Sequence, residues 1–304
     1  MSLLSRIKPK GPNGFGYGST AADVTEGIDL KGRTILITGC NSGIGLESAR
    51  TLGARGAHVI GAARSLGKAG EALAGLKDST PVTCELSEPD SVRACVKAVK
   101  ALGRPLDVIL CNAGIMALPK LEQRHGVDLQ LFTNHIGHFI LVTGLLDSLS
   151  DAGRIVIVSS EAHKNAPSEG IDFDDLSGEK RYSAWRNYGQ SKLANILFAR
   201  ELAKRLKGTS KVANALHPGV IQTNLARHMN VAARVGVAIA NPLFLKTIPE
   251  GAATQCYLAA HPDAAAVSGE YFSDCNVART SPQGRDMAQA ARLWETSEAI
   301  AARV

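Results

Sequence analysis

The sequence predicts an α/β fold: a single domain built on a doubly wound parallel sheet, with helices on both faces. Three observations carry this prediction. From Arg33 onward, strand-like and helix-like segments alternate, which is typical of parallel strands joined by right-handed crossovers. No repeat or interior linker divides the 304 residues, a length that can bury one large core. A glycine-rich turn joins the first predicted strand to the first predicted helix.

Strands are predicted where β-branched and apolar residues run together, and helices where apolar residues recur at helical spacing. The predicted strands are 33–38, 57–62, 81–86, 106–111, 154–159 and 211–216. The predicted helices are 43–55, 88–102, 126–149, 186–206 and about 283–302. Residues 1–29 are rich in Gly, Pro and Ser and are expected to form an N-terminal arm before a domain over 30–304. Phe15 and Tyr17 would hold the arm on the surface; the alternative is disorder.

Composition excludes several classes of function. The net charge of +6 comes from Lys and Arg interleaved with Asp and Glu, which favours a solvated basic surface over a nucleic-acid site. The six cysteines show no metal-ligand spacing, and His135, His138 and His163 share no spacing with a carboxylate or cysteine, so we expect no metal. We find no signal peptide and expect no membrane span, which predicts a cytoplasmic protein.

The stretch from Thr38 to Gly45 is suited to binding phosphate. Glycines permit a tight turn and close approach of a pyrophosphate, and the unpaired N–H groups of a helix start attract negative charge. The predicted ligand is therefore a dinucleotide, although a plain strand-to-helix connector can have the same pattern. The candidate contacts are Gly39, Asn41, Ser42, Gly43, Ile44 and Gly45.

In a dinucleotide fold, an acidic residue near the end of the second predicted strand would hydrogen-bond both adenosine ribose hydroxyls and repel a 2′-phosphate. Here that place holds Ala63, followed by Arg64. A guanidinium instead pairs with phosphate and stacks on adenine. We therefore expect NADP(H), with NAD(H) possible; the alternative is an exposed arginine at a strand end. Glu85-Leu86, placed at the end of the third predicted strand, could accept the adenine amino group or cap helix 88–102.

Asn112-Ala113-Gly114 ends the fourth predicted strand, at the edge of the sheet where ligands bind in such folds. Small residues there let the backbone approach a cofactor, and Asn112 could equally be a turn residue. These three residues join the list of predicted cofactor contacts.

Tyr188 and Lys192 lie four residues apart in a predicted helix and so share one face. A tyrosine ionises near pH 10, and a neighbouring ammonium lowers that pKa, which would give an acid/base group with its tuning cation. A surface Tyr/Lys pair is the alternative. Ser160, or less favourably Ser159, ends an apolar strand and would place a hydroxyl at the carboxyl edge of the sheet. Asn134 lies within a predicted helix, where a polar asparagine lowers helix stability unless it has a function.

These motifs together resemble the short-chain dehydrogenase/reductase family, over about residues 30–275. The motifs are Thr38-Gly39-x-x-x-Gly43-Ile44-Gly45, Asn112-Ala113-Gly114, Asn134, Ser160, Tyr188-x-x-x-Lys192 and His217-Pro218-Gly219. Within the family the chain is most similar to the retinol dehydrogenase-like and WW-domain oxidoreductase-like branch. That similarity rests on Phe15–Thr20, Asn134–Phe139, Ser159–His163 and Ser268–Cys275.

The resemblance implies a Rossmann fold and an NAD(P)-dependent oxidoreductase acting on CH-OH donors. It implies that Tyr188 exchanges a proton with the substrate oxygen, Lys192 lowers the pKa of that tyrosine and binds the nicotinamide ribose, Ser160 polarises the oxygen, and Asn134 holds a relay water. Pro218, Val220 and Thr223 would flank the nicotinamide.

The resemblance also places a substrate lid at about 224–250, whose apolar residues suggest a hydrophobic carbonyl or alcohol as the small-molecule substrate. In this family the predicted helices 126–149 and 186–206 commonly form a dimer interface, so a homo-oligomer (dimer or tetramer) is expected, unless the arm or the C-terminal helix blocks it. A non-catalytic NADP-binding sensor or scaffold is the main alternative, and an epimerase or dehydratase is the second.

Overall fold

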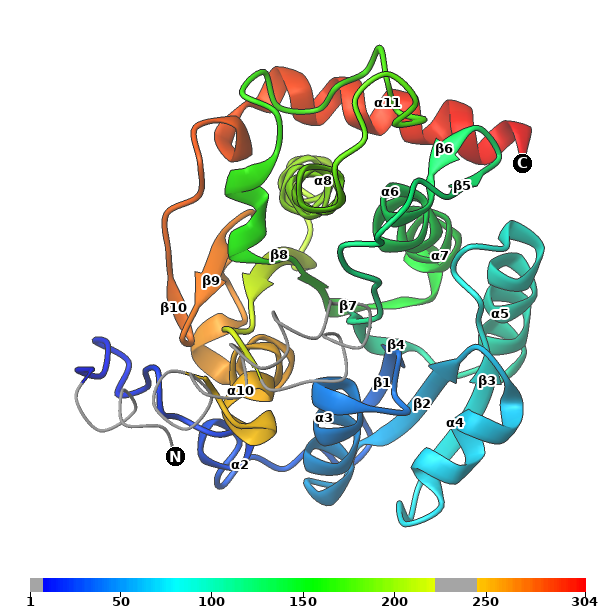
Figure 1. The fold of residues 1–304 in the computed structure, drawn as a ribbon. Coiled ribbons are helices and arrows are strands. Elements are labelled where there is room, and N and C mark those ends of the chain that lie inside the picture. The colour runs from blue at the N-terminus through cyan, green and yellow to red at the C-terminus, as the bar shows by residue number, and fades with distance from the viewer. Residues whose placement is uncertain (1–7, 222–244) are drawn as a thin grey trace.

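The computed structural model describes residues 8–221 and 245–304, and within them a mixed sheet forms the centre of the molecule (Figure 1). Its strand order is β10-β9-β8-β7-β4-β1-β2-β3, and all neighbours pair in parallel except β10 with β9. The strands are β1 Thr34–Thr38, β2 His58–Ala63, β3 Ser79–Thr83, β4 Leu106–Cys111, β7 Leu149–Val158, β8 Val212–His217, β9 Tyr271–Ser273 and β10 Asn276–Val277. The order reverses between β1 and β4, as in a doubly wound sheet, so the predicted fold class is confirmed.

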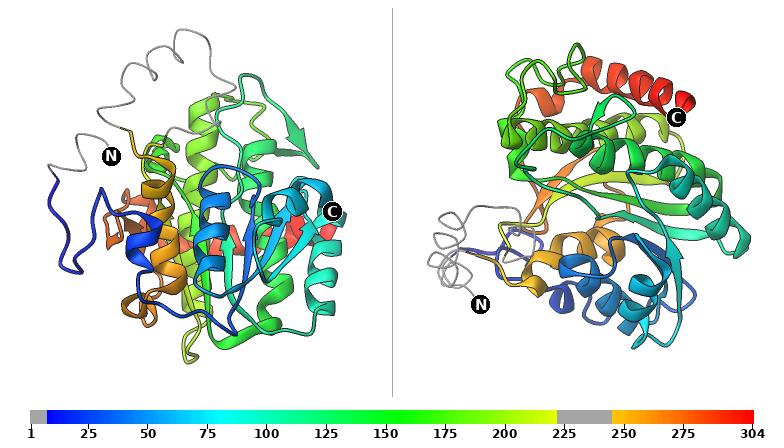
Figure 2. Two further views of the ribbon diagram at one scale, coloured as in Figure 1. Left: turned by 90° about the horizontal axis from the view of Figure 1, so that it is seen from below. Right: turned by 45° about the vertical axis from the view of Figure 1, so that its right-hand side comes forward.

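Helices cover both faces of the sheet (Figure 2). On one face lie α5 Pro89–Ala101, α7 Gly137–Leu145 and α8 Ala184–Arg205; on the other lie α2 Ala21–Val24, α3 Gly43–Ala54, α4 Leu66–Leu73 and α10 Ile248–Ala260. Strand residues alternate between the two cores: Leu36 of β1 packs with the first set of helices, and Ile35 and Ile37 with the second. A sheet buried on both faces accounts for the unbroken apolar run in this strand.

A further helix, α11 Met287–Arg303, packs outside α7 and α8 (Figure 1). Trp294 lies edge-on to Phe139 of α7, with ring centroids 5.0 Å apart, and the Arg205 guanidinium of α8 sits 4.1 Å from the centre of the indole. His135 Nε2 and Ser297 Oγ form a buried hydrogen bond of 2.8 Å. The predicted C-terminal helix therefore covers the helices that were expected to form a dimer interface.

The predicted helix 126–149 is interrupted. The chain forms a small hairpin of β5 Gln123–Arg124 and β6 Val127–Asp128, then α6 Leu129–Leu131, a π-helix η1 Phe132–Ile136, α7, and a 3-10 turn η2 Leu146–Ser148. Asp128 starts the helix by accepting hydrogen bonds from the N–H groups of Gln130 and Leu131, both 3.0 Å long. Among the described residues, Leu129–Ser148 is also one stretch long and apolar enough to span a membrane, but most of it is buried inside the protein.

Other boundaries also differ from the sequence prediction. β3 ends at Thr83 rather than 86, so Glu85 and Leu86 follow the strand instead of closing it. β7 begins at Leu149 rather than 154, because Leu149 pairs with Leu106 of β4. The helices α4 and α10 were not predicted, nor were the short elements α2, β5, β6, η3 Glu161–Asn165, η5 Pro262–Ala264, η6 Gln283–Arg285, β9 and β10.

The part of the N-terminal arm from residue 8 onward lies against α10 and the β9–β10 hairpin (Figure 1). The Phe15 ring packs edge-on against Tyr257 and His261, and Tyr17 is buried. Polar contacts add to this packing: Asn13 Nδ2 donates to the Cys275 carbonyl over 2.7 Å. The arm is thereby fixed beside the turn between β9 and β10, at the carboxyl end of β9.

Candidate active site

The glycine-rich turn between β1 and α3 is built around two close backbone approaches. Gly39 has a φ of +67°, and a Cβ there would lie 3.0 Å from the Cβ of Ala113. A Cβ on Gly45 would lie 2.3 Å from the Gly39 carbonyl oxygen, so only glycine lets α3 start this close to the turn. The Ser42 side chain caps no N–H group of α3 and the first turn contains no acidic residue, so the helix start presents its donors outward.

Asn112 holds this turn in place. Its Nδ2 donates to the carbonyls of Thr38 and Gly39, at 2.9 and 3.4 Å. The Thr38 hydroxyl in turn accepts the N–H groups of Asn112 and Ala113, both at 3.0 Å. Gln255 of α10 donates to Asn112 Oδ1 over 3.3 Å. Asn112 thus ties the ends of β1 and β4 together, a structural role beyond either of the two considered from the sequence.

Tyr188 and Lys192 are both buried on the inner side of α8. Lys192 Nζ lies 5.7 Å from the centre of the Tyr188 ring and donates to the Val158 carbonyl over 3.0 Å. Burial lowers the pKa of Lys192 to about 8. The two side chains lie one helical turn apart on the face of α8 that is turned toward the sheet. This placement excludes the alternative of a surface Tyr/Lys pair.

The pKa of Tyr188 differs from the expectation. Burial raises it to about 12, and a hydrogen bond with the Ser160 side chain lowers it only in part. The Lys192 ammonium donates to the Val158 carbonyl. At neutral pH the phenol of this protein therefore carries its proton.

The two serines after β7 have different partners. Ser159 donates its hydroxyl to the Lys192 carbonyl over 2.7 Å, which holds α8 against the strand. The Ser160 hydroxyl accepts the Ala162 N–H over 3.1 Å and lies beside Tyr188. Ser159 is thus occupied by a structural bond, and Ser160 faces the phenol.

Asn134 lies in the π-helix η1, and this bulge turns its amide toward the loop after β4. Its Oδ1 accepts the Ile115 N–H over 2.8 Å, and its Nδ2 donates to the Ile115 carbonyl and to Ser191 Oγ, both over 2.9 Å. A Cβ on Gly114 would lie 3.0 Å from Asn134 Oδ1 and 3.5 Å from Lys192 Nζ. The end of β4 therefore brings the glycine-rich turn and the Tyr188/Lys192 helix together.

The residues after β2 and β3 are less constrained. The side chain of Arg64 is 61% exposed, and its Nε lies 4.0 Å from Glu85 Oε2. The Glu85 carboxylate accepts the Ser87 N–H and hydroxyl, so it stabilises the loop before α5 and does not cap the helix, whose N-cap is Glu88. Leu86 is buried, and its carbonyl lies against Gly137 of α7.

Pro218 and Val220 follow β8 at the same edge, with Val220 exposed. Thr223 and most of the predicted lid, residues 222–244, lie outside the described residues. Residues 248–250 of the predicted lid form the first turn of α10, which Thr247 and Glu250 cap reciprocally.

Sequence reasoning considered His138 only as a histidine that binds no metal, and it did not consider Lys246. The His138 ring joins Thr38 Oγ1, 2.9 Å from its Nε2, to the Asn134 carbonyl, 3.0 Å from its Nδ1, and burial lowers its pKa to about 4. The sequence signal that could have identified His138 is its spacing of four residues from Asn134. Lys246 is buried below Gly219, and nothing in the local sequence indicates that.

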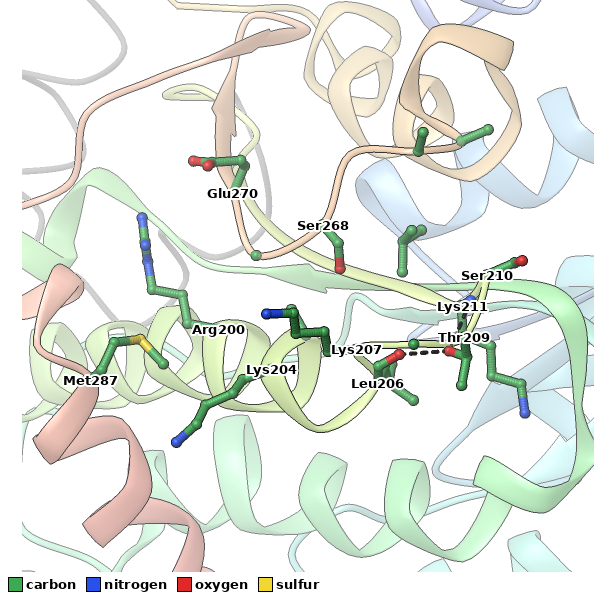
Figure 3. A pocket seen from close by; sticks show the side chains of 16 residues that line it. Arg200, Lys204, Leu206, Lys207, Thr209, Ser210, Lys211, Ser268, Glu270 and Met287 are labelled. Atoms are coloured by element: carbon green, nitrogen blue, oxygen red, sulfur yellow. Dashed lines mark hydrogen bonds between the residues drawn. The ribbon is translucent and has the colours of Figure 1, made fainter.

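A pocket of about 670 Å³ opens at the other end of the molecule (Figure 3). It is lined by Arg200, Lys204, Lys207 and Lys211 with Glu270 and Met287, beside the amino end of β8. The candidate site lies at the carboxyl end of the same sheet, so this pocket is not part of it. Lys204 is already paired with Glu201 at 3.6 Å.

Comparisons with known proteins decide the family. The short chain dehydrogenase profile matches residues 33–172. "Short-chain dehydrogenase TIC 32 B, chloroplastic" of Brassica napus is 44% identical and covers 98% of each chain. This chain belongs to the short-chain dehydrogenase/reductase family.

The retinol dehydrogenase-like branch is also confirmed. "Retinol dehydrogenase 14" of Mus musculus is 40% identical over 89% of this chain and 86% of its own length. Among solved structures, an uncharacterized protein from Mycobacterium paratuberculosis superposes with a TM-score of 0.75 at 34% identity, covering 93% of this chain and 97% of its own. The chain is therefore an oxidoreductase of a family that acts on CH-OH groups with a nicotinamide cofactor.

Proposed function

We propose that this protein is an NADP(H)-dependent oxidoreductase that interconverts a hydrophobic ketone or aldehyde and its alcohol, with Tyr188 as the acid/base group. The observation that carries the proposal is the position of Gly114, whose Cα faces Asn134 and Lys192 while the same strand end holds the glycine-rich turn. A cofactor bound along that edge would place its reactive ring beside the buried phenol.

The chain's own residues fit a dinucleotide. The uncapped start of α3 and the glycine positions 39, 43 and 45 would receive the pyrophosphate, with Asn41, Ser42 and Ile44 beside it. The loop from Asn112 to Gly114 would line the cofactor, and Pro218, Val220 and Thr223 would flank its nicotinamide. Arg64 is exposed where a 2′-phosphate would lie, which favours NADP(H) over NAD(H).

The acid/base chemistry follows from the protonation states. A nicotinamide bound there would supply or accept the hydride. Tyr188, whose pKa is about 12, holds its proton at neutral pH and is suited to give it to a carbonyl oxygen, which supports the reductive direction. Ser160, beside the phenol, would hydrogen-bond the same oxygen.

Replacing the proton of Tyr188 needs a path from solvent. Lys192, with a pKa of about 8, can exchange a proton near neutrality. Both N–H groups of the Asn134 amide are used by protein partners, but Oδ1 keeps one lone pair that can accept a hydrogen bond from a relay water. We therefore retain Asn134, Ser160, Tyr188 and Lys192 as the catalytic set.

The wider organisation is also proposed here. Residues 1–29 would be an arm on a domain over 30–304 with a lid at about 224–250, in a cytoplasmic protein. A homo-oligomer stays a prediction, and because α11 covers α7 and α8, it would use another surface. Light scattering on the purified chain measures its mass in solution and decides between a monomer and an oligomer.

The test is the rate of NADPH consumption, with NADH in parallel, on aldehydes and ketones of increasing hydrophobic size. We expect NADPH to be preferred and turnover to rise with substrate bulk. Tyr188→Phe should bind NADPH with unchanged affinity, seen by nicotinamide fluorescence, and lose at least about 100-fold in turnover. Cofactor binding without turnover on any member of the panel would favour the sensor alternative, and full turnover by the Phe variant would remove Tyr188 from the mechanism.

A further inference from the structure

Lys246 is a lysine whose side chain is completely buried. Its Nζ lies 2.6 Å from Asp274 Oδ1 and 4.8 Å from the centre of the Tyr17 ring. A buried ammonium is costly unless a carboxylate and favourable dipoles surround it, and removing one partner leaves the other uncompensated. Packing alone therefore does not explain why a lysine occupies this buried position.

The backbone and stem of Lys246 support the loop after β8. Its N–H donates to the Val220 carbonyl over 2.9 Å, and the residue forms an isolated parallel bridge with Ile221. Gly219 has a φ of +97°, and a Cβ there would lie 2.5 Å from Lys246 Cδ. The lysine stem therefore lies directly against the backbone of the Pro218–Ile221 loop.

The partner carboxylate is presented by a strained turn. Ser273 and Asn276 pair across the β9–β10 hairpin, so Asp274 and Cys275 form a two-residue loop, with φ values of +53° and +64°. Such loops favour Asn or Asp at the first position and Gly at the second, so Cys275 is the strained residue and holds its positive φ only because its surroundings fix it. Asn276 Nδ2 donates to the Asp274 carbonyl over 2.7 Å, and Cys275 N–H donates to Thr254 Oγ1 over 3.1 Å.

The N-terminal arm closes the arrangement from outside. Tyr17 presents its ring to Lys246, and Asn13 donates to the Cys275 carbonyl on the same turn. Three segments far apart in the sequence thus meet at one ammonium: the arm, the loop after β8 and the β9–β10 turn.

We propose that Lys246, held by Asp274 and covered by Tyr17, is a positioning residue that sets the geometry of the Pro218–Ile221 loop and thereby the affinity for the nicotinamide end of the cofactor. The inference rests on the proposed function, because that loop is assigned to the nicotinamide. Lys246 lies behind the loop and takes no part in the proton transfer at Tyr188.

The test separates cofactor affinity from chemistry. Lys246→Met keeps a stem of similar length on Gly219 and removes the charge, and Asp274→Asn keeps a side chain that tolerates positive φ. We expect each to raise the Kd for NADPH, measured by nicotinamide fluorescence, and its KM about tenfold, with kcat within twofold. The double variant should show no further loss, and Tyr17→Leu should raise the same constants about twofold.

Glu201→Gln is the matched control, since Glu201 is buried and pairs with Arg205 at 2.9 Å near the other end of α8. It should lower Tm without moving the NADPH constants. Lower Tm with unchanged Kd and KM in the Lys246 and Asp274 variants would reduce the pair to a structural role and overturn the inference. Failure of the unaltered protein to bind NADPH would instead overturn the proposed function, and the inference with it.

Discussion

The two ends of the proposed cofactor site differ in how firmly the structure holds their side chains. At the adenosine end, Arg64 is mostly exposed and its nearest charged partner, Glu85, is 4.0 Å away. At the nicotinamide end, Lys192 and Asn134 are buried, and the hydrogen bonds of each go to backbone or side-chain groups of other elements.

This difference assigns different tasks to the two ends. Exposed side chains with weak ion pairs contribute little to stability and can change with small cost. Buried polar groups in a shared network are coupled to folding, because any lost partner leaves an unsatisfied group. Substitutions at the adenosine end can therefore change the cofactor preference without destabilising the protein. Substitutions of the buried polar residues at the nicotinamide end also affect the stability of the fold.

The largest effect is expected from Lys192→Met, measured as the pH dependence of the unfolding free energy. The pKa of Lys192 is about 8 in the fold and near its ordinary 10.5 when unfolded. Between these values the unfolded chain holds a proton that the folded chain has lost, so Lys192 adds about 2 kcal/mol of stability from pH 8 to 10. Buried cysteines act in the opposite direction over the same range, because burial raises the pKa of Cys40, Cys111 and Cys256. The raised pKa of Tyr188 does so above about pH 10. The contribution of Lys192 is therefore the difference between the unaltered protein and the Met variant.

Urea unfolding at pH 8, 9 and 10 measures this contribution as the difference in unfolding free energy between the unaltered protein and the Met variant. The Met variant should lack it and should also lose turnover. Lys97→Met, at an exposed position on α5, is the control and should follow the unaltered protein. Parallel curves for all three proteins would mean that Lys192 is not desolvated in solution.

Gly45→Ala tests the junction between the two ends. The new Cβ would lie 2.3 Å from the Gly39 carbonyl oxygen and 2.4 Å from Asn112 Nδ2, so the turn must shift. We expect a loss of about 1–3 kcal/mol in unfolding free energy and loss of NADPH binding. Gly67→Ala is the control: a Cβ there meets nothing within 4 Å, and it should stabilise α4 by up to about 1 kcal/mol. Equal stability of the two variants would show that the close approach is not rigid.

The sequence predicted those parts of the fold that depend on local pattern. The alternation of strands and helices, the glycine-rich turn and the four-residue spacing of Tyr188 and Lys192 are all readable within a short window. Helix α4 was missed because Gly67 and Gly70 weaken its pattern within eight residues, and β9 and β10 are too short to show a period.

Other features depend on contacts between distant residues. The π-helix that turns Asn134 inward is paired with the backbone of Ile115, and nothing in Phe132–Ile136 alone indicates it. The raised pKa of Tyr188 follows from burial, which spacing on one helix cannot show. Burial of Lys246 depends on Asp274 and Tyr17, which lie far from it in the sequence.

Arg64→Asp tests the exposed end. Replacing the guanidinium by a carboxylate removes a charged partner for the 2′-phosphate and adds one that repels it, so the preference should reverse from NADPH to NADH. The ratio of the two kcat/KM values should change about 10- to 100-fold, while the unfolding free energy stays within about 0.5 kcal/mol. Arg104→Asp makes the same charge change at another exposed arginine and should leave the ratio unchanged. An unchanged ratio in the Arg64 variant would refute the phosphate contact.

Glu85→Gln should have the smallest effect and decides what Glu85 does. Its carboxylate is held by Ser87 and lies 4.0 Å from Arg64 Nε, so it competes with a phosphate for the guanidinium. Glutamine keeps an acceptor oxygen for Ser87 and removes the charge. The KM for NADPH should therefore fall about twofold and that for NADH should stay constant, because a partly exposed pair at this distance is weak. A rise of tenfold in both KM values would mean instead that the carboxylate itself accepts the adenine amino group, and the adenosine end would then be as specifically built as the nicotinamide end.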